Sequence, residues 1–399
     1  MRTNGALPDD WCVHHFDHLS PELAGTLPET MARVRELCPV ARSDQHGGFW
    51  VAAGYQDAVA VARDWETYSS TMGLAIVNGG ARPVRNLPVE ADPPEQRIFK
   101  NLTNVFFTPT AIAPWEEPTR ALVNELIDGF VERDRCDFMD EFARKLPSLA
   151  FFRFALNAPA GEVEKVAKLA STSSVPNHPK SRESWAGLYV WIKEFVAQRR
   201  AQPARGDVVD AVIAAEVEGR PITEDEIIGT VQLLILGGLE TTAGALGLML
   251  LRLCRQPHIA DLLRGQPELM PAAVQELLRL EPPFVSVGRT ATRDAELGGC
   301  PVEKGDKVLI HWASANRDGS EFEAPDEFRL DREHNRHVTF GMGPHRCTGS
   351  NLARMNIKVA LEELLRRLDG IALAEDAEIH FHAGLTRSPL RLPLTFTPR

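Results

Sequence analysis

The sequence lacks the features of several large protein classes. It has no excess of basic residues, since 44 lysines and arginines against 55 aspartates and glutamates give a net charge of −11, which argues against nucleic acid as a partner. Its six cysteines lie far apart without any CxxC pair, so we expect neither a disulfide scaffold nor a structural zinc site. No linker and no internal repeat is recognisable.

A targeting segment and a membrane span are also lacking. Residues 1–20 contain no apolar core and do not form a signal or an anchor. The longest apolar stretch, residues 231–251, is interrupted by Glu240 and two threonines, which favours a buried helix over a membrane span. The composition, 44% hydrophobic and 25% charged, is that of a soluble globular protein. We therefore expect a cytoplasmic protein with one domain over residues 1–399, in which residues 1–20 form a polar N-terminal extension.

Helical periodicity dominates what is present. We expect helices over residues 29–37, 55–63, 94–106, 118–133, 162–170, 184–202, 208–216, 224–255, 271–280 and 352–367. Strands are expected over residues 49–53, 285–292, 308–311 and 392–397, with a turn at Gly298-Gly299. Helices early and strands late, without βαβ alternation, predict a single mainly α fold of the α+β kind.

Residues 340–349, FGMGPHRCTG, carry the strongest chemical signal in the chain. They place Cys347 in a glycine-rich loop directly before the helix expected from residue 352. The backbone N–H groups and the positive dipole end of that helix would favour a thiolate, and we expect a lowered thiol pKa that suits metal binding. Gly341, Gly343 and Gly349 allow a tight turn and the close approach of a flat ligand. The alternative is an inert buried cysteine in an ordinary loop.

The whole string resembles the haem-binding loop of the cytochromes P-450, Phe-Gly-x-Gly-x-His-x-Cys-x-Gly, at every fixed position. The resemblance implies heme b (iron protoporphyrin IX) with Cys347 as the axial thiolate ligand of the iron. It further implies that Phe340 packs against the sulfur, that His345 reaches a haem propionate, and that Gly341 and Gly349 shape the loop. Thiolate ligation of this kind favours O–O cleavage. The family's fold has a long central helix over the haem and a small β-sheet region.

The expected helix 224–255 contains an acid in an unfavourable place. Its middle, LILGGLETTAGALGLML, is apolar on nearly every side, so a carboxylate at Glu240 is costly unless it is paired or functional. Gly237 and Gly238 weaken the helix by about 1 kcal/mol each, which indicates a local opening where a ligand approaches. A glycine-mediated helix crossing with Glu240 in a salt bridge is the alternative. GGLETT resembles the family's oxygen-activation segment, which implies that Glu240 and Thr241 deliver protons and that Gly237 leaves space over the haem.

Residues 275–283, QELLRLEPP, place Glu276 and Arg279 on one helix face. Such a pair alone is normally a solvated ion pair. Because it follows the long helix and precedes the cysteine loop, it resembles the family's Glu-x-x-Arg, with Arg332 as the third member. The resemblance implies that these three residues lock the cysteine loop in place, a structural role.

Two further cations are candidates for binding the haem propionates. Arg289 in VSVGRTATRD resembles the family's propionate-binding arginine, and a guanidinium can bind a carboxylate through two hydrogen bonds. The alternative is an ordinary arginine on a surface strand. ADPPEQRIFKNL resembles the start of the family's C helix. Many bacterial members have His and Arg where this chain has Gln96 and Lys100. Lys100 retains a positive charge for a propionate but lacks the fork of an arginine.

The substrate-facing residues are carried over position by position from the resemblance. We expect a mostly apolar wall, and therefore a small to medium apolar substrate: Leu233, Leu236, Val285, Val287, Leu385, Thr386 and Leu74. Residues 71–91 are the expected lid, with an ordinary surface loop as the alternative. DPPEQR and GGLET resemble camphor-type hydroxylases, but none of the three tyrosines lies in the lid, which disfavours camphor itself.

Together these features predict a monomeric monooxygenase that uses O₂. The chain has no flavin, NAD or iron–sulfur motif, so we expect electrons from a separate ferredoxin and its reductase. Lys100, Arg346 and Arg354, on the Cys347 side, would meet an acidic partner. The alternatives are a peroxide-driven peroxygenase and a haem-thiolate sensor without turnover; a zinc site built on His345 and Cys347 lacks further ligands.

Overall fold

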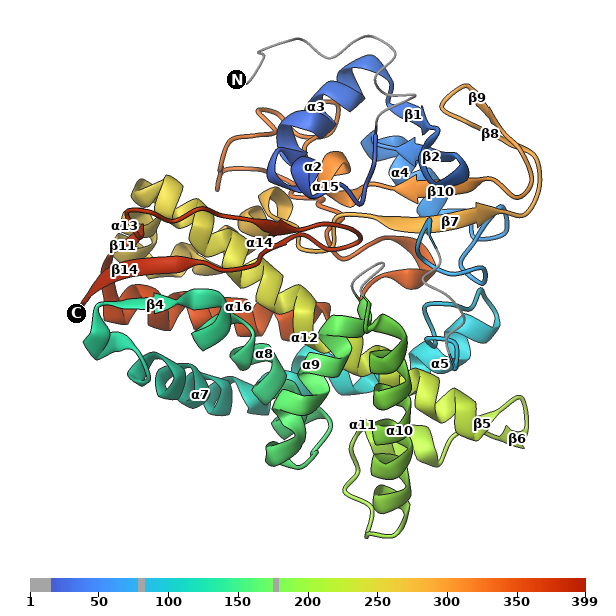
Figure 1. Ribbon diagram of the computed structural model, residues 1–399, viewed down its shortest axis with the longest axis horizontal. Helices are drawn as coiled ribbons and strands as arrows, with labels where there is room; N and C mark the ends of the chain where they lie inside the picture. The colour runs from blue at the N-terminus through green and yellow to red at the C-terminus, as the bar shows by residue number, and fades with distance from the viewer. Residues whose placement is uncertain (1–15, 78–82, 175–178) are drawn as a thin grey trace.

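The computed structural model describes residues 16–77, 83–174 and 179–399, and it is mainly helical (Figure 1). Its α-helices, in chain order, are α2 Pro21–Gly25, α3 Leu27–Leu37, α4 Tyr55–Arg63, α5 Glu95–Asn104, α6 Pro109–Ile112, α7 Glu116–Asp128, α8 Lys145–Ala150, α9 Val163–Ser174, α10 Ser181–Arg200, α11 Val208–Ile213, α12 Glu224–Arg255, α13 Pro257–Gly265, α14 Met270–Leu280, α15 Trp312–Ala315 and α16 Ser350–Arg367. The mainly α architecture expected from the sequence is confirmed.

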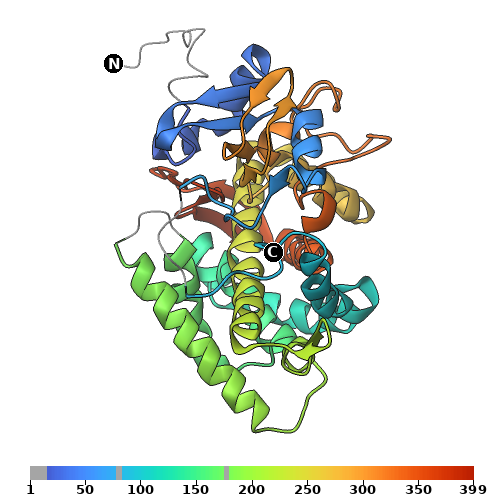
Figure 2. The ribbon, with the colours of Figure 1, turned by 90° about the vertical axis from the view of Figure 1, so that its right-hand side faces the viewer.

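Helix α12 runs through the middle of the molecule (Figure 2). It has the bounds that the periodicity predicts, and it begins with a capping box in which Thr223 Oγ1 accepts from the Glu226 N–H and the Glu226 carboxylate accepts from the Thr223 N–H. By length and composition α12 alone among the described helices could cross a membrane. Its most apolar window is 61% buried within the protein, as in a core helix of a soluble protein.

Two sheets of more than two strands lie beside the helices in the described part of the chain. The five-stranded sheet has the order β1-β2-β10-β7-β3, with β10 parallel to β2 and the other pairs antiparallel. Its strands are β1 Val40–Ser43, β2 Phe49–Ala52, β3 Tyr68–Ser69, β7 Val287–Ala291 and β10 Lys307–Ile310. The second sheet has the order β11-β14-β4, from β4 Arg135–Asp137, β11 Leu368–Leu373 and β14 Pro393–Pro398. The Gly298-Gly299 turn joins β8 Ala295–Leu297 to β9 Cys300–Val302, and both glycines have positive φ.

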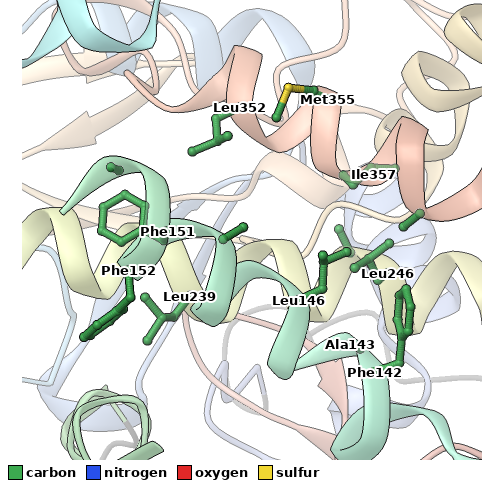
Figure 3. Close-up of a cluster of buried hydrophobic side chains, with 14 of the residues drawn as sticks. Phe142, Ala143, Leu146, Phe151, Phe152, Leu239, Leu246, Leu352, Met355 and Ile357 are labelled. Atoms are coloured by element: carbon green, nitrogen blue, oxygen red, sulfur yellow. The ribbon is translucent and has the colours of Figure 1, made fainter. Parts of the chain in front are cut away.

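The main core packs α12 between α8 and α16 (Figure 3). The side chains labelled there come from these three helices and the π-helical turns that flank α8, residues 139–143 and 151–155. The sequence did not predict this helical segment, because it is buried on most sides and shows little amphipathic period. It also did not predict α13. A proline breaks the interior of a helix, so the expected helix ends before Pro257, but in the structure this residue lies in the first turn of a new helix.

The N-terminal segment is only partly described. Residues 1–15 of the expected polar extension lie outside the described residues. Phe16 is 1% exposed and packs in a cluster with Phe49, so the packed domain starts before residue 20. The Ser43 hydroxyl donates to the Phe16 carbonyl at 2.7 Å and holds this segment against the five-stranded sheet.

Candidate active site

A cavity of about 1030 Å³ lies between α12, the loop that carries Cys347 and the five-stranded sheet. Of the residues predicted to face the substrate, six border it: Leu233, Leu236, Val287, Leu385, Thr386 and Leu74. The prediction for Val285 is wrong. Its side chain is 4% exposed and packs in the cluster with Phe16 instead. The N–H groups of residues 285 and 286 both donate to the Leu385 carbonyl, which breaks the strand alternation before β7 begins.

The loop from Phe340 to Cys347 is built around two left-handed glycines. Gly341 and Gly343 have φ of 71° and 69°, a region that residues with a Cβ rarely adopt. A Cβ on Gly343 would also lie 2.5 Å from the Ala62 carbonyl oxygen. The Cys347 N–H donates to the Phe340 carbonyl at 2.8 Å and closes the turn. The Cys347 side chain has accessible surface, and it borders the cavity.

The expected lowering of the Cys347 pKa is wrong for the protein alone. Desolvation by the surrounding protein raises the pKa of the thiol above its usual value. The Gly349 N–H, at the start of α16, donates to the sulfur and acts in the opposite direction, together with the charges of Lys100, Arg354 and Arg346. The helix terminus is therefore placed as predicted, but desolvation by the surrounding protein has the larger effect on the pKa of the thiol. A bound metal cation would reverse this balance, because coordination deprotonates a thiol.

The Phe340 ring lies at the base of the loop beside a cation. The Arg354 guanidinium carbon lies 4.3 Å from the ring centroid, and Arg354 Nε donates to Gln275 Oε1 at 3.0 Å. The packing of the ring against the Cys347 sulfur stays a prediction. Arg354 is thus committed to contacts within the protein.

On α12 the residues predicted to activate oxygen border the same cavity. Glu240 and Thr241 are partly exposed to it, and Thr241 Oγ1 donates to the Gly237 carbonyl at 3.0 Å. Glu240 forms no ion pair or hydrogen bond with any described residue, so the salt-bridge alternative is not observed there. A Cβ on Gly237 would have no atom within 4 Å, whereas a Cβ on Gly238 would lie 2.8 Å from the Phe151 ring. One glycine opens onto the cavity, and the other permits close helix packing.

The predicted Glu-Arg-Arg group is assembled in the structure. Glu276, 1% exposed, accepts from Arg279 at 2.8 and 2.7 Å and from Arg332 Nε at 3.0 Å. Arg279 Nη1 donates to the carbonyl of Asn316 at 2.9 Å. The Asn316 side chain in turn bonds the Val338 N–H and the Thr339 hydroxyl, both at 2.7 Å. These contacts connect the buried ion pairs to the residues directly before the cysteine loop.

Arg289 is a buried cation that has no carboxylate partner among the described residues. It lies on β7, borders the cavity and is 4% exposed, and its guanidinium donates one hydrogen bond within the described part of the chain, to the Gly288 carbonyl at 2.8 Å. Burial lowers the pKa of Arg289 to about 10, although the charge of Asp92 acts in the opposite direction. His345 borders the same cavity and meets Ser70 Oγ at 3.2 Å. Burial, with the charges of Arg289 and Lys100, lowers the pKa of His345 to about 3.

Lys100 borders the cavity but makes bonds that the sequence did not predict. Its Nζ donates to the carbonyls of Pro344 and Arg346 at 2.6 and 2.7 Å, and Gln96 Nε2 also donates to Pro344 at 2.6 Å. Both residues of α5 therefore hold the cysteine loop through its main chain. Of the three cations expected on the docking side, only Arg346 is exposed, because Lys100 and Arg354 are half-buried in these internal contacts. The expected docking patch is smaller than predicted.

Several cavity residues carried no signal in the sequence. Phe284 borders the cavity and forms an isolated antiparallel β-bridge with Thr386. Trp185, on α10, also borders the cavity. Part of the expected lid, residues 78–82, lies outside the described residues. Within the rest of it, Leu74 lines the cavity, Ile76 is buried in the cluster with Phe16, and Met72 is 61% exposed. These placements depend on chain crossings that local patterns do not encode.

Comparison with known proteins gives a consistent picture. A family model described as "Cytochrome P450" matches residues 174–392. The chain is 35% identical to a probable cytochrome P450 127A1 of Sinorhizobium fredii, over 84% of this chain and 81% of that protein. It is 32% identical to a steroid C26-monooxygenase of Mycolicibacterium smegmatis, over 90% of each chain. The crystal structure of cytochrome P450 CYP101C1 superposes with a TM-score of 0.88 at 30% identity, covering 99% of this chain and 100% of that one. The chain belongs to the cytochrome P450 family.

Proposed function

We propose that this cytochrome P450 is a monooxygenase that inserts one oxygen atom of O₂ into a small to medium apolar substrate, by hydroxylation or oxidative demethylation. One observation carries the proposal: the Cys347 side chain and the Glu240-Thr241 pair border a single cavity with mostly apolar walls. A site with both a thiolate ligand and an acid–alcohol pair is suited to reductive cleavage of O₂.

The residues that surround the cavity fit a haem. Cys347 offers a sulfur ligand, and the buried, carboxylate-free Arg289 matches a propionate in charge and geometry. His345, neutral at working pH, offers a ring nitrogen to the second propionate. Gly237 leaves the space that a flat macrocycle and its ligand need beside α12. A bound haem supplies the iron at which O₂ is reduced and split.

The acid and the alcohol have separate tasks in this proposal. The Thr241 hydroxyl donates its hydrogen bond to the Gly237 carbonyl. Its oxygen can therefore accept a hydrogen bond from a proton-donating group in the cavity. Glu240 has no competing partner among the described residues and borders the cavity, so it exchanges protons with water. This pair argues against a peroxide-driven peroxygenase, which needs no proton supply for O₂, and against a sensor without turnover.

The substrate class follows from the cavity walls and from the relatives. The substrate-side residues are mainly aliphatic and aromatic, including Leu233, Leu236, Phe284 and Val287. Three of the relatives are named steroid C26-monooxygenases, and one, 27% identical, is a cytochrome P450-terp of a Pseudomonas species. A steroid or terpenoid is therefore the first choice for screening, followed by aromatics and lipid alcohols.

Electrons come, in this proposal, from a separate ferredoxin and its reductase, in the cytoplasm, to a monomeric enzyme. The chain carries no motif for a flavin or an iron–sulfur cluster. The exposed Arg346 adjoins Cys347 in the chain and offers a positive charge to an acidic donor.

Carbon monoxide spectroscopy tests the proposal. The reduced, CO-treated protein should show the red-shifted Soret band of thiolate-ligated haem, and Cys347→His should abolish it. Cys300→Ser, which alters a cysteine outside the cavity, is the matched control and should keep the band. A histidine-type spectrum in the unaltered protein would refute the assignment. Spin-shift titration with steroids, terpenoids, aromatics and fatty alcohols then identifies the substrate class.

A further inference from the structure

A second group of ligating side chains lies outside the Cys347 site. One ligand atom each from Asp17, His18 and His46 lies within 4.8 Å of the other two. Asp17 and His18 belong to the N-terminal segment, and His46 belongs to the turn between β1 and β2, Gln45–Gly47. Among the residues that the structure describes, no other trio of His, Cys, Asp or Glu meets this distance.

The three side chains are held in place by their surroundings. His46 Nε2 lies 2.7 Å from Asp17 Oδ1, which also accepts from the Leu19 N–H at 2.9 Å. The His18 ring packs edge-on against His46 and Phe49, with ring centroids 5.4 and 5.3 Å apart. Phe49 itself is buried in the sheet. Little conformational entropy therefore remains to be lost when a ligand orders these groups.

Two polar atoms of this group make no hydrogen bond in the described part of the chain, and the first of them is buried. His18 Nδ1 is buried and makes no hydrogen bond in the described part of the chain. Asp17 Oδ2 likewise has no hydrogen-bond partner among the described residues, since both bonds to this carboxylate use Oδ1. An unpaired imidazole nitrogen and a free carboxylate oxygen beside a second imidazole form an incomplete donor set. A cation would complete it.

We propose that Asp17, His18 and His46 bind a divalent transition-metal ion, and that Zn²⁺ is the best match. Two imidazoles and one carboxylate are ligands that Zn²⁺ accepts at about 2.0–2.2 Å, with water in the fourth position. Tetrahedral ligands at that distance stand roughly 3.3 Å apart. The His46–Asp17 pair therefore opens by roughly 0.6 Å from its 2.7 Å contact, and the His46 proton moves to Nδ1.

Metal binding at this place ties the N-terminal segment to the β1–β2 turn. His18 and Leu19 border the large cavity, so the segment that the ion fixes forms part of the cavity wall. Phe16, two residues away from His18, is already buried in the sheet cluster and limits the movement needed. The bound ion thus stabilises the fold at the cavity edge without touching the Cys347 loop.

Zn²⁺ titration of the chelator-treated, haem-loaded protein tests the proposal by calorimetry and by zinc analysis after dialysis. The unaltered protein should bind one equivalent. Asp17→Asn and His46→Gly should each weaken binding at least about tenfold, because even outer-shell partners of a metal contribute that much. Glycine suits position 46, where φ is 55°, so that variant removes the ligand without backbone strain. At a hundredfold excess over the Kd of the unaltered protein, Zn²⁺ should raise the Tm of that protein by about 3 °C and the Tm of His46→Gly by less than about 2 °C.

Two controls separate this site from other histidines. His380→Ala removes an exposed histidine that lies 3.7 Å from Glu378 without a third ligand, and it should bind Zn²⁺ as the unaltered protein does. A variant with His14 and His15 both changed to alanine should also keep the binding, and its loss would overturn the three-residue assignment. The proposal is equally overturned when the unaltered protein binds no Zn²⁺, or when Asp17→Asn and His46→Gly both bind it undiminished.

Discussion

Replacing Glu276 by alanine should destabilise the protein strongly, because it leaves two buried guanidinium groups without their carboxylate. Arg279 is fully buried and the Arg332 side chain is 7% exposed, and neither has a second carboxylate within 4.0 Å in the described residues. Breaking a buried ion pair by removing one partner costs about 3–5 kcal/mol. The entropy of unfolding of 399 residues is about 0.8 kcal/mol/K, so the Tm should fall by about 4–6 °C.

Thermal unfolding followed by circular dichroism measures this change. Glu36→Ala is the matched control, because Glu36 also pairs with an arginine three residues away, at 2.8 Å, but its side chain is 69% exposed. Exposed pairs contribute at most about 1 kcal/mol, so the control should shift Tm by roughly 1 °C or less. Equal shifts for both variants would refute the view that burial makes the Glu276 group important. Glu276→Gln keeps the shape of the side chain, so its Tm shift should lie between those of Glu276→Ala and Glu36→Ala.

The surroundings of Glu276 also predict how the stability of the protein depends on pH. Burial alone raises the pKa of Glu276, but the hydrogen bonds and charge of Arg279, with bonds from residues 329 and 332, outweigh it and hold the pKa below 4.5. A carboxyl whose pKa is lowered on folding stabilises the protein above its unfolded value and loses this contribution as the pH falls through the folded pKa. The unaltered protein should therefore lose more Tm than Glu276→Gln on acidification below about pH 4.5.

Two further predictions concern α12. Thr241→Ala should leave substrate binding intact but divert reducing equivalents to peroxide, measured as peroxide formed per electron pair; unchanged coupling would contradict the proton-delivery role. Gly237→Ala and Gly238→Ala gain the same helix propensity, but only the second brings a Cβ within 2.8 Å of the buried Phe151 ring. Because overpacking costs about 1–3 kcal/mol, Gly238→Ala should unfold roughly 1–4 °C below Gly237→Ala, and equal Tm values would contradict the packing argument.

Local patterns predicted the elements that have a clear period or a clear start. The bounds of α4 and α12 agree with the sequence, and the capping box at Thr223 is present as a reciprocal pair of bonds. The segment around α8 was not predicted, because burial on most sides removes the amphipathic period. The placement of Val285 was carried over by position from the family resemblance, and position alone does not encode the irregular backbone before β7.

The sequence by itself determined the family and the fold class, and it predicted the residues of the site, because the fixed positions around Cys347 and the GGLET segment are local strings that can be recognised without a structure. Only the tertiary structure decided the electrostatic state of those residues. The Cys347 pKa depends on how many protein atoms exclude water, and the bonds of Lys100 depend on where the cysteine loop crosses α5. The group of Asp17, His18 and His46 likewise exists only because the N-terminal segment folds onto a distant turn. Desolvation and long-range contact are properties of the packed chain, and no local pattern encodes them.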